Sequence, residues 1–261
     1  MDRLQAQRIF FADFITASAG IPKKDRRLAN AFASVPRERF VGPGPWKIFT
    51  SSGLLETPSD DPAFLYQDVT VSPALARKIA QASAAAGIHF LDAPVTGGTW
   101  GAEKGELLFM IGGEAADLAA ARPILSAMGK KLFHLGPNGA GQTIKLAMNL
   151  ILALQVDALA EALALVTRAG LQGEKLVEVL QSSMARSGVL DVKAPNLLKG
   201  EYVPSFPLRL MHKDLGLALD LANQLGVALP ATAAARETYN YVKGAAKEDL
   251  DYSAVMKFWK R

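Results

Sequence analysis

The chain has 261 residues, and 50% of them are hydrophobic, which is enough for a sizeable core in one large or two small domains. Its net charge is +4 at pH 7, carried by scattered basic residues, so we predict no nucleic-acid partner. No cysteine is present, which excludes disulfides and thiolate metal sites. The three histidines, His89, His134 and His212, have no second ligand at helical or strand spacing, so no metal site is predicted.

Neither a leader nor a membrane span is expected. The first residues, MDRLQAQRIFFADF, lack the apolar region and cleavage site of a signal peptide. Residues 144–166 form the most apolar segment, but Lys145, Asn149, Asp157 and Glu161 interrupt it. A buried helix of a soluble, cytoplasmic protein is the better prediction.

Residues 1–66 have an irregular pattern. Helices are predicted at 3–18 and 25–34, and the stretch 35–64 is dense in Pro, Gly, Ser and Asp, which predicts a loop.

An ordered alternation of helices and strands follows. A helix is expected after Ser72 as N-cap, with Pro73 in its first position and Gly87 as its stop. Strands are expected at 88–95, 106–112 and 131–136, with a helix at 114–129 between the last two. Residues 67–136 therefore predict an α/β layer.

After Gly136 the pattern is helical only. The segment from Gly139 to Gly170, roughly thirty residues, is predicted to be helical and is apolar on nearly every face, as in the centre of a bundle. Further helices are expected near 173–184, 206–225, 230–245 and 253–260, with Ser205 as the cap of the second.

Three segments carry groups that could do chemistry. In DAPVTGG, Thr96, Gly97 and Gly98 follow a predicted strand, and they form either a plain turn or a backbone site for a carboxylate. In GPNGAGQTIKLAMN, Lys145 and Asn149 project from one helix face. They are either a general acid/base with a polar partner, or a lysine that reaches the surface beside a satisfied core asparagine.

The third segment is HKDLGLALD. Lys213 and Asp214 lie away from the apolar stripe of Leu208, Met211 and Leu215, so taken alone they predict solvated charges on an outer helix face.

Together, these motifs resemble those of the β-hydroxyacid dehydrogenases, the family of 3-hydroxyisobutyrate dehydrogenase. The resemblance covers residues 67–261 and rests on TVSP at 70–73, DAPVTGG with GAEKGELLFMIGG, GPNGAGQTIKLAMN, and the spaced F…L…HKDLGLAL. It implies an α/β remnant of a dinucleotide-binding, Rossmann-like domain at 67–136, and an all-helical dehydrogenase domain at 137–261 that also forms a homodimer.

The resemblance also implies the roles of individual residues. Lys145 matches the lysine that exchanges the proton of the substrate hydroxyl, and Asn149 matches an asparagine that hydrogen-bonds the substrate. Thr96, Gly97 and Gly98 match a Ser-Gly-Gly segment that holds the substrate carboxylate.

For the cofactor, Thr70 matches a residue beside the nicotinamide ribose, and Lys213 matches a lysine near the cofactor. The implied reaction is hydride transfer between NAD or NADP and a small 3-hydroxy acid or semialdehyde.

The family's G-x-G-x-x-G fingerprint has no counterpart in this sequence. Residues 1–66 instead resemble the N-terminal segment of protein-L-isoaspartate O-methyltransferases, through LANAFASVPRERFVGPGPWKIF and DDPAFLYQDVTV. A fusion joined near Gln67–Val71 is the resulting prediction. Three functions stay open: a hydroxyacid dehydrogenase, a catalytically inert dimerising protein, and a methyltransferase relative.

Overall fold

The structure is a computed structural model. It describes residues 47–50, 53–56, 72–85, 87, 89–246 and 250–259. The chain divides into two compact units, Met1–Lys145 and Leu146–Arg261, and each is described by itself. The helices expected at 3–18 and 25–34 lie outside the described residues.

The first unit contains a hairpin where a loop was expected. Strand β1 (Lys47–Thr50) pairs antiparallel with β2 (Gly53–Glu56), so the loop prediction for 35–64 was wrong over these residues. Pro, Gly, Ser and Asp surround these two runs, but the apolar residues of KIFT and GLLE suit short paired strands.

Helix α3 (Pro73–Ala85) confirms the expected start and stop. The Ser72 hydroxyl accepts a hydrogen bond from the Leu75 amide at 3.2 Å, and Gly87 has a φ of +68°. Serine at the N-cap and a left-handed glycine beyond the last turn are the features that bound this helix.

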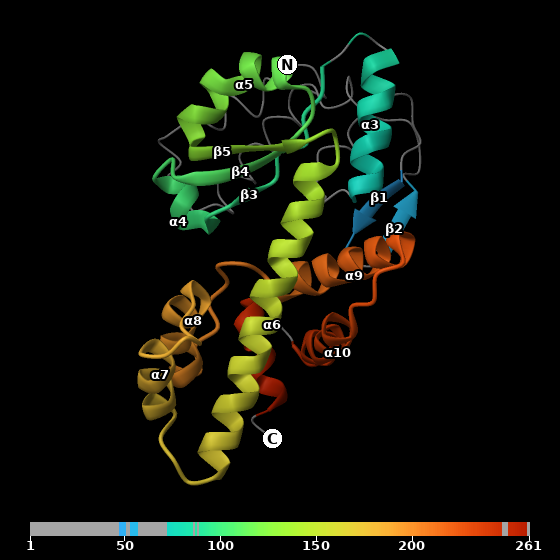
Figure 1. The fold of residues 1–261 in the computed structure, drawn as a ribbon. Helices are drawn as coiled ribbons and strands as arrows, with labels where there is room; N and C mark the ends of the chain where they lie inside the picture. Colours follow the sequence, from blue (N-terminus) through green and yellow to red (C-terminus); the bar gives the residue numbers. More distant parts are fainter. Residues whose placement is uncertain are drawn as a thin grey trace, which may run out of the picture. The chain divides into compact units, whose positions relative to one another are not determined.

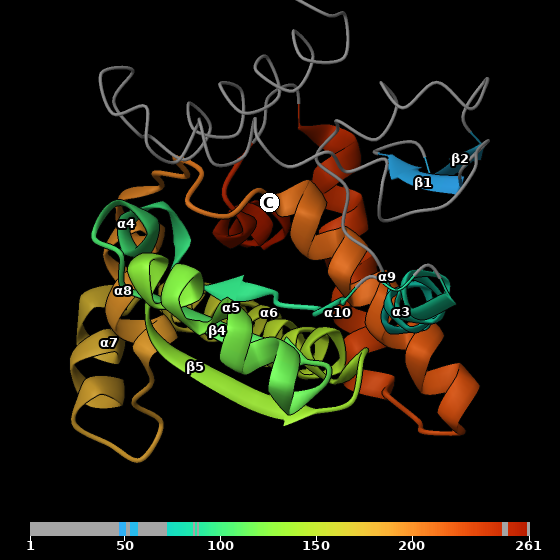
Figure 2. The same cartoon turned by 90° about the horizontal axis from the view of Figure 1, so that it is seen from above.

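A three-stranded sheet with order β3-β4-β5 lies in the same unit (Figure 1). Its strands are β3 (Val95–Thr96), β4 (Leu107–Gly112) and β5 (Gly129–Gly136). Strands β3 and β4 are antiparallel, and β4 and β5 are parallel. Helix α5 (Ala115–Met128) connects the parallel pair (Figure 2). Its Leu118 packs with Phe109 and Ile111 of β4 in one buried cluster.

The strand predicted at 88–95 is mostly irregular. Asp92 pairs with Gly112 as an isolated bridge, and the Pro94 carbonyl accepts from the Met110 amide. The segment therefore runs beside β4, but Pro94 has no N–H to donate, which interrupts the ladder until Val95.

The second unit is helical. Its elements are the larger part of α6 (Ala140–Arg168), α7 (Gly173–Gln181), α8 (Gly188–Lys199), α9 (Leu208–Leu225), α10 (Pro230–Ala245) and the 3-10 helix η3 (Tyr252–Phe258). Helix α8 was not predicted, because Gly188 and Pro195 within it argue against a helix. Its ends do carry ordinary signals, a Ser187 cap and a left-handed Gly200.

Among the described helices, α6 is the one long and apolar enough to cross a bilayer by length and composition. Its residues Val156, Ala160 and Leu163 belong to the buried core of the second unit, together with Met211, Tyr239 and Val255. This packing fits the predicted buried helix.

The carboxylate of Asp251 joins three segments of this unit. It accepts from the Lys193 ammonium of α8 at 2.7 Å, from the Ser205 and Phe206 amides, and from the Ser253 amide and hydroxyl. Burial alone would raise the pKa of Asp251, but the bonds from Lys193 and Ser253 outweigh it and lower that pKa. Ser205 is engaged here and does not cap α9, as had been expected; Pro207 is the N-cap.

Asp157 on α6 is also a buried acid, but its pKa shifts in the opposite direction to that of Asp251. One of its oxygens, Oδ1, is buried without a hydrogen-bond partner. Burial, and next the negative charge of Glu161, raise the pKa of Asp157 from 3.8 to about 6. The folded state therefore binds this proton more tightly than the unfolded chain does.

The raised pKa of Asp157 predicts that the stability of the fold decreases as the pH rises. The stability that protonated Asp157 contributes is complete below about pH 4 and is lost as the pH rises through about 6. Asp157→Asn should therefore raise the melting temperature at pH 8 and have little effect at pH 4, measured by circular dichroism. Asp220→Asn, at an exposed position, is the control. A variant less stable than the parent at pH 8 would contradict the assignment.

Candidate functional site

The Thr96-Gly97-Gly98 segment turns the chain directly from a strand into a helix. Strand β3 ends at Thr96, Gly97 (φ +130°) is the N-cap, and Gly98 (φ +62°) begins α4 (Gly98–Glu103). Two successive positive φ values need glycine. The sharp turn is confirmed, the short helix after it was not expected, and carboxylate binding stays a prediction.

Asp92, just before this turn, caps the long helix α6. Its Oδ1 accepts from the Gly139 amide at 2.6 Å, and its Oδ2 accepts from the Gln142 amide at 3.0 Å. Unpaired amides and the positive end of the helix dipole make this a favourable place for a carboxylate. The contact is tight, because a Cβ on Gly112 would lie 2.8 Å from the Pro137 carbonyl oxygen and also meet Asp92.

Lys145 and Asn149 lie four residues apart on α6, so they project from the same side of the helix. Lys145 is half-buried, whereas Asn149 is 2% exposed. The predicted pairing on one helix face is confirmed, and their chemical roles stay predictions.

Asn149 is held by the motif on α9. Its Nδ2 donates to Asp214 Oδ2 at 2.6 Å, and both side chains are buried. Lys213 Nζ lies 3.1 Å from the other oxygen, Asp214 Oδ1, as an ion pair without the geometry of a hydrogen bond.

The prediction of solvated charges for Lys213 and Asp214 was therefore wrong. Asp214 comes three residues after Met211 and three before Leu217, both buried, which places it within the buried face of α9. That spacing could have revealed Asp214 from the sequence. Its partner could not have been found, because Asn149 is 65 residues away.

His212, the neighbour of Lys213, is neutral at ordinary pH. Burial, and next the charges of Lys243 and Arg236, lower the pKa of His212 to about 4. Its Nδ1 lies 3.3 Å from Lys243 Nζ, so the neutral ring can accept from the ammonium.

The other two histidines have unrelated neighbours: His89 lies beside Asp117 and His134 contacts the Gly113 carbonyl. In the described part of the chain, no three His, Asp or Glu side chains gather as a metal would need. Thr70, the expected cofactor contact, lies outside the described residues.

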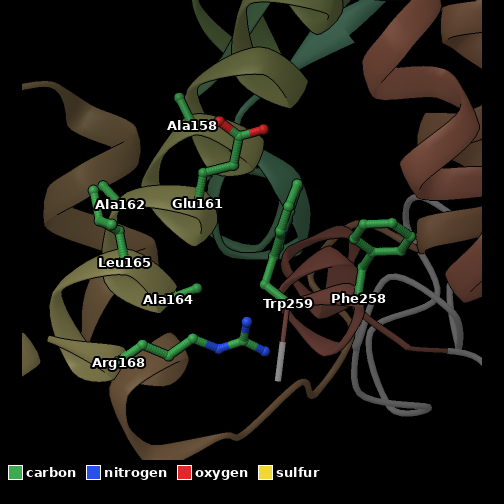
Figure 3. A pocket seen from close by; sticks show the side chains of 8 residues that line it. All are labelled: Ala158, Glu161, Ala162, Ala164, Leu165, Arg168, Phe258 and Trp259. Carbon is green, nitrogen blue, oxygen red and sulfur yellow. The ribbon is translucent and has the colours of Figure 1, made fainter. Parts of the chain in front are cut away.

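An open pocket of about 770 Å³ lies in the second unit, between α6 and the end of η3. Its walls are mostly apolar, with Glu161 and Arg168 of α6 toward opposite ends and Trp259 facing them (Figure 3). The full lining is Ala158, Glu161, Ala162, Ala164, Leu165, Arg168, Phe258 and Trp259.

Two family models match the chain. The NAD-binding domain of NADP-dependent 3-hydroxyisobutyrate dehydrogenase matches residues 139–259, and the NAD-binding domain of 6-phosphogluconate dehydrogenase matches residues 47–136. Both matches place the chain in the class of NAD(P)-binding dehydrogenases.

Individual proteins narrow the class. The chain is 36% identical to 2-(hydroxymethyl)glutarate dehydrogenase of Eubacterium barkeri, over 82% of this chain and 76% of that one. It is 39% identical to 3-hydroxyisobutyrate dehydrogenase of Pseudomonas aeruginosa, over 80% and 72%. The structure of 3-hydroxyisobutyrate dehydrogenase from Mycobacterium tuberculosis with L-serine matches with a TM-score of 0.69 and 35% identity, over 74% and 68%. The chain belongs to the β-hydroxyacid dehydrogenase family.

Both matching family models describe NAD-binding domains, so the cofactor is NAD or NADP. Within the described residues, two glycine-containing passages lead from a strand of the parallel pair into a helix. In the passage from β5 to α6, the carboxylate of Asp92 already binds the amides at the helix start. The other passage leads from β4 to α5. Its glycines, Gly112 and Gly113, are packed against Asp92 and Leu91, and Glu114 and Asp117 occupy the N-cap and first turn of α5. Two acids at a helix N-terminus repel a phosphate, so this passage does not fit a pyrophosphate.

The Asp92 cap leads to a stability prediction. Asp92→Asn replaces one of the two acceptor oxygens with an NH₂ group that faces a backbone N–H, which should cost about 2 kcal/mol. Hydrogen exchange followed by mass spectrometry should show faster exchange across the first turn of α6. The matched control is Asp191→Asn, which removes a carboxylate that pairs with Arg186 at the surface. Unchanged protection of the Gln142 amide would refute the capping role.

Proposed function

We propose that the chain is an NAD(P)-dependent oxidoreductase that acts on a small 3-hydroxy acid or the matching semialdehyde. When bound, the nicotinamide exchanges a hydride with the carbinol carbon of the substrate. The observation that carries the proposal is the pair on α6, Lys145 with Asn149, whose amide is anchored to Asp214. The family membership and the names of the relatives support it.

Each residue has a distinct part in the proposed chemistry. Lys145 accepts the hydroxyl proton as the alcohol is oxidised and returns it in the reverse direction, as a positioned amine can. Asn149 hydrogen-bonds the substrate, and Thr96, Gly97 and Gly98 bind its carboxylate through the hydroxyl and backbone amides. Thr70 and Lys213 contact the cofactor.

The domain organisation is also a proposal. It assigns 1–66 to a methyltransferase-like segment, 67–136 to a truncated α/β domain and 137–261 to the helical dehydrogenase domain. The NAD-binding match begins at residue 47, so it includes residues on both sides of the junction proposed near Gln67–Val71. Long-read sequencing of the gene across this junction tests whether the fusion is present in the source genome.

The proposed assembly is a cytoplasmic homodimer formed through the helical domain. Support comes from the apolar side chains that α6 leaves exposed in the second unit, Ile151 (52%) and Leu165 (72%). Leu165 also lines the pocket with Phe258 and Trp259 (Figure 3).

The proposed activity predicts a selective effect of Lys145→Met. With 3-hydroxyisobutyrate, L-serine or another short hydroxy acid as substrate, kcat/KM should fall about a thousandfold, because general acid/base catalysis contributes 10²–10⁴. The affinity for NADH or NADPH, followed by fluorescence, should change less than about twofold. Lys199→Met, at an exposed position on α8, is the matched control.

The cofactor titration separates the alternative functions. If millimolar NADH and NADPH give no binding signal with the unaltered chain, dehydrogenase activity is excluded for it, and the inert dimer becomes the better explanation. Calorimetric binding of S-adenosylmethionine would instead favour the methyltransferase relative.

The proposed homodimer predicts that a charge at Leu165 separates the two subunits. Leu165→Glu places a charge on the exposed apolar face of α6 and should shift the mass in light scattering from twice 27.8 kDa to 27.8 kDa. Leu171→Glu, beyond the end of α6 and 63% exposed, should leave the dimer intact. A wild-type chain that is already monomeric at micromolar concentration would overturn the proposal.

A further inference from the structure

The link between Asn149 and Asp214 determines which way an amide faces. Asn149 is on α6 and Asp214 is on α9, and their side chains are 2% and 5% exposed. Their 2.6 Å contact, from Nδ2 to Oδ2, is among the shortest hydrogen bonds of the second unit. An ionised carboxylate accepts hydrogen bonds and cannot donate them, so it selects the NH₂ side of the amide.

The opposite orientation of the Asn149 amide is strongly disfavoured. A flipped side chain would bring its carbonyl oxygen against the carboxylate of Asp214, and two buried acceptors would then face each other without a proton between them. The Asn149 oxygen is therefore directed away from Asp214. Lys213, 3.1 Å from the second carboxylate oxygen, supplies a counter-ion that offsets the cost of burying this charge.

We propose that Asp214 is a positioning residue: it fixes the amide of Asn149 in one orientation, so that the same polar edge always faces the substrate. This inference rests on the proposed function, in which Asn149 binds the substrate. Asp214 itself does not touch the substrate. Its effect passes through Asn149, because preorganised hydrogen-bonding groups avoid the cost of orienting themselves when the substrate binds.

A double-mutant cycle tests this coupling. Asp214→Asn removes the orienting charge and leaves a side chain that can bond either orientation of Asn149. We expect it to raise the KM for the hydroxy acid about tenfold and to leave the affinity for NADH within about twofold. Asn149→Ala should raise KM at least as much, and the double variant should be no worse than Asn149→Ala alone. Asp220→Asn, on the exposed side of the same helix, is the control.

A second measurement reports the anchor without requiring activity. In nuclear magnetic resonance spectra, the side-chain NH₂ of Asn149 should show a downfield, slowly exchanging proton that is lost in Asp214→Asn and largely kept in Asp214→Glu. Asp214→Glu, which keeps the carboxylate, should also recover part of the KM. Circular dichroism confirms that each variant folds, and Asp214→Glu carries the comparison if Asp214→Asn does not.

The outcomes distinguish failure of the positioning role of Asp214 from failure of the proposed dehydrogenase function. If the unaltered chain binds no NADH, the proposed function fails and the catalytic meaning of the anchor fails with it, even with the downfield proton present. If the chain is active but the KM effects of Asp214→Asn and Asn149→Ala multiply, Asp214 is only structural and the positioning role is overturned. Absence of the downfield proton in the active wild-type chain also overturns it.

Discussion

One carboxylate determines where α6, the longest of the described helices, begins. Asp92 binds the amides of Gly139 and Gln142 through separate oxygens, and its own backbone pairs with Gly112 of β4. The helix start is therefore tied to the sheet of the first unit by both side chain and main chain. Since a helix advances 100° per residue, fixing its first turn also fixes the direction in which Lys145 leaves the helix, one turn later.

The elements predicted well from the sequence are those specified locally. Helix α3 has a serine cap, a proline in its first position and a left-handed glycine after its end, all between Ser72 and Gly87. Strands β4 and β5 are short apolar runs, and both were anticipated. Two predictions failed for equally local reasons. Proline interrupts the strand expected beside β4, and the glycine and proline within α8 argued against a helix there.

The candidate site was only partly accessible by the same reasoning. The spacing of Lys145 and Asn149 lies within one helix, so their position on the same face could be predicted from the sequence. The anchor of Asn149 depends on a contact between helices distant in sequence, so the pairing of Asn149 with Asp214 could not be predicted. Asp214 belongs to the buried face of α9 because that face is wide and includes Leu217, three residues after Asp214, as well as Met211.

The hydrogen bonds to Asp251 join segments of the second unit that are synthesised at different times. The Lys193 ammonium and the Ser205 amide are made well before their acceptor, since Asp251 follows Ser205 by 46 residues. Until residue 251 has left the ribosome, a lysine that is 5% exposed in the finished unit has no counter-ion among these contacts. Burying an unpaired lysine costs several kcal/mol, so the final packing of α8 depends on Asp251.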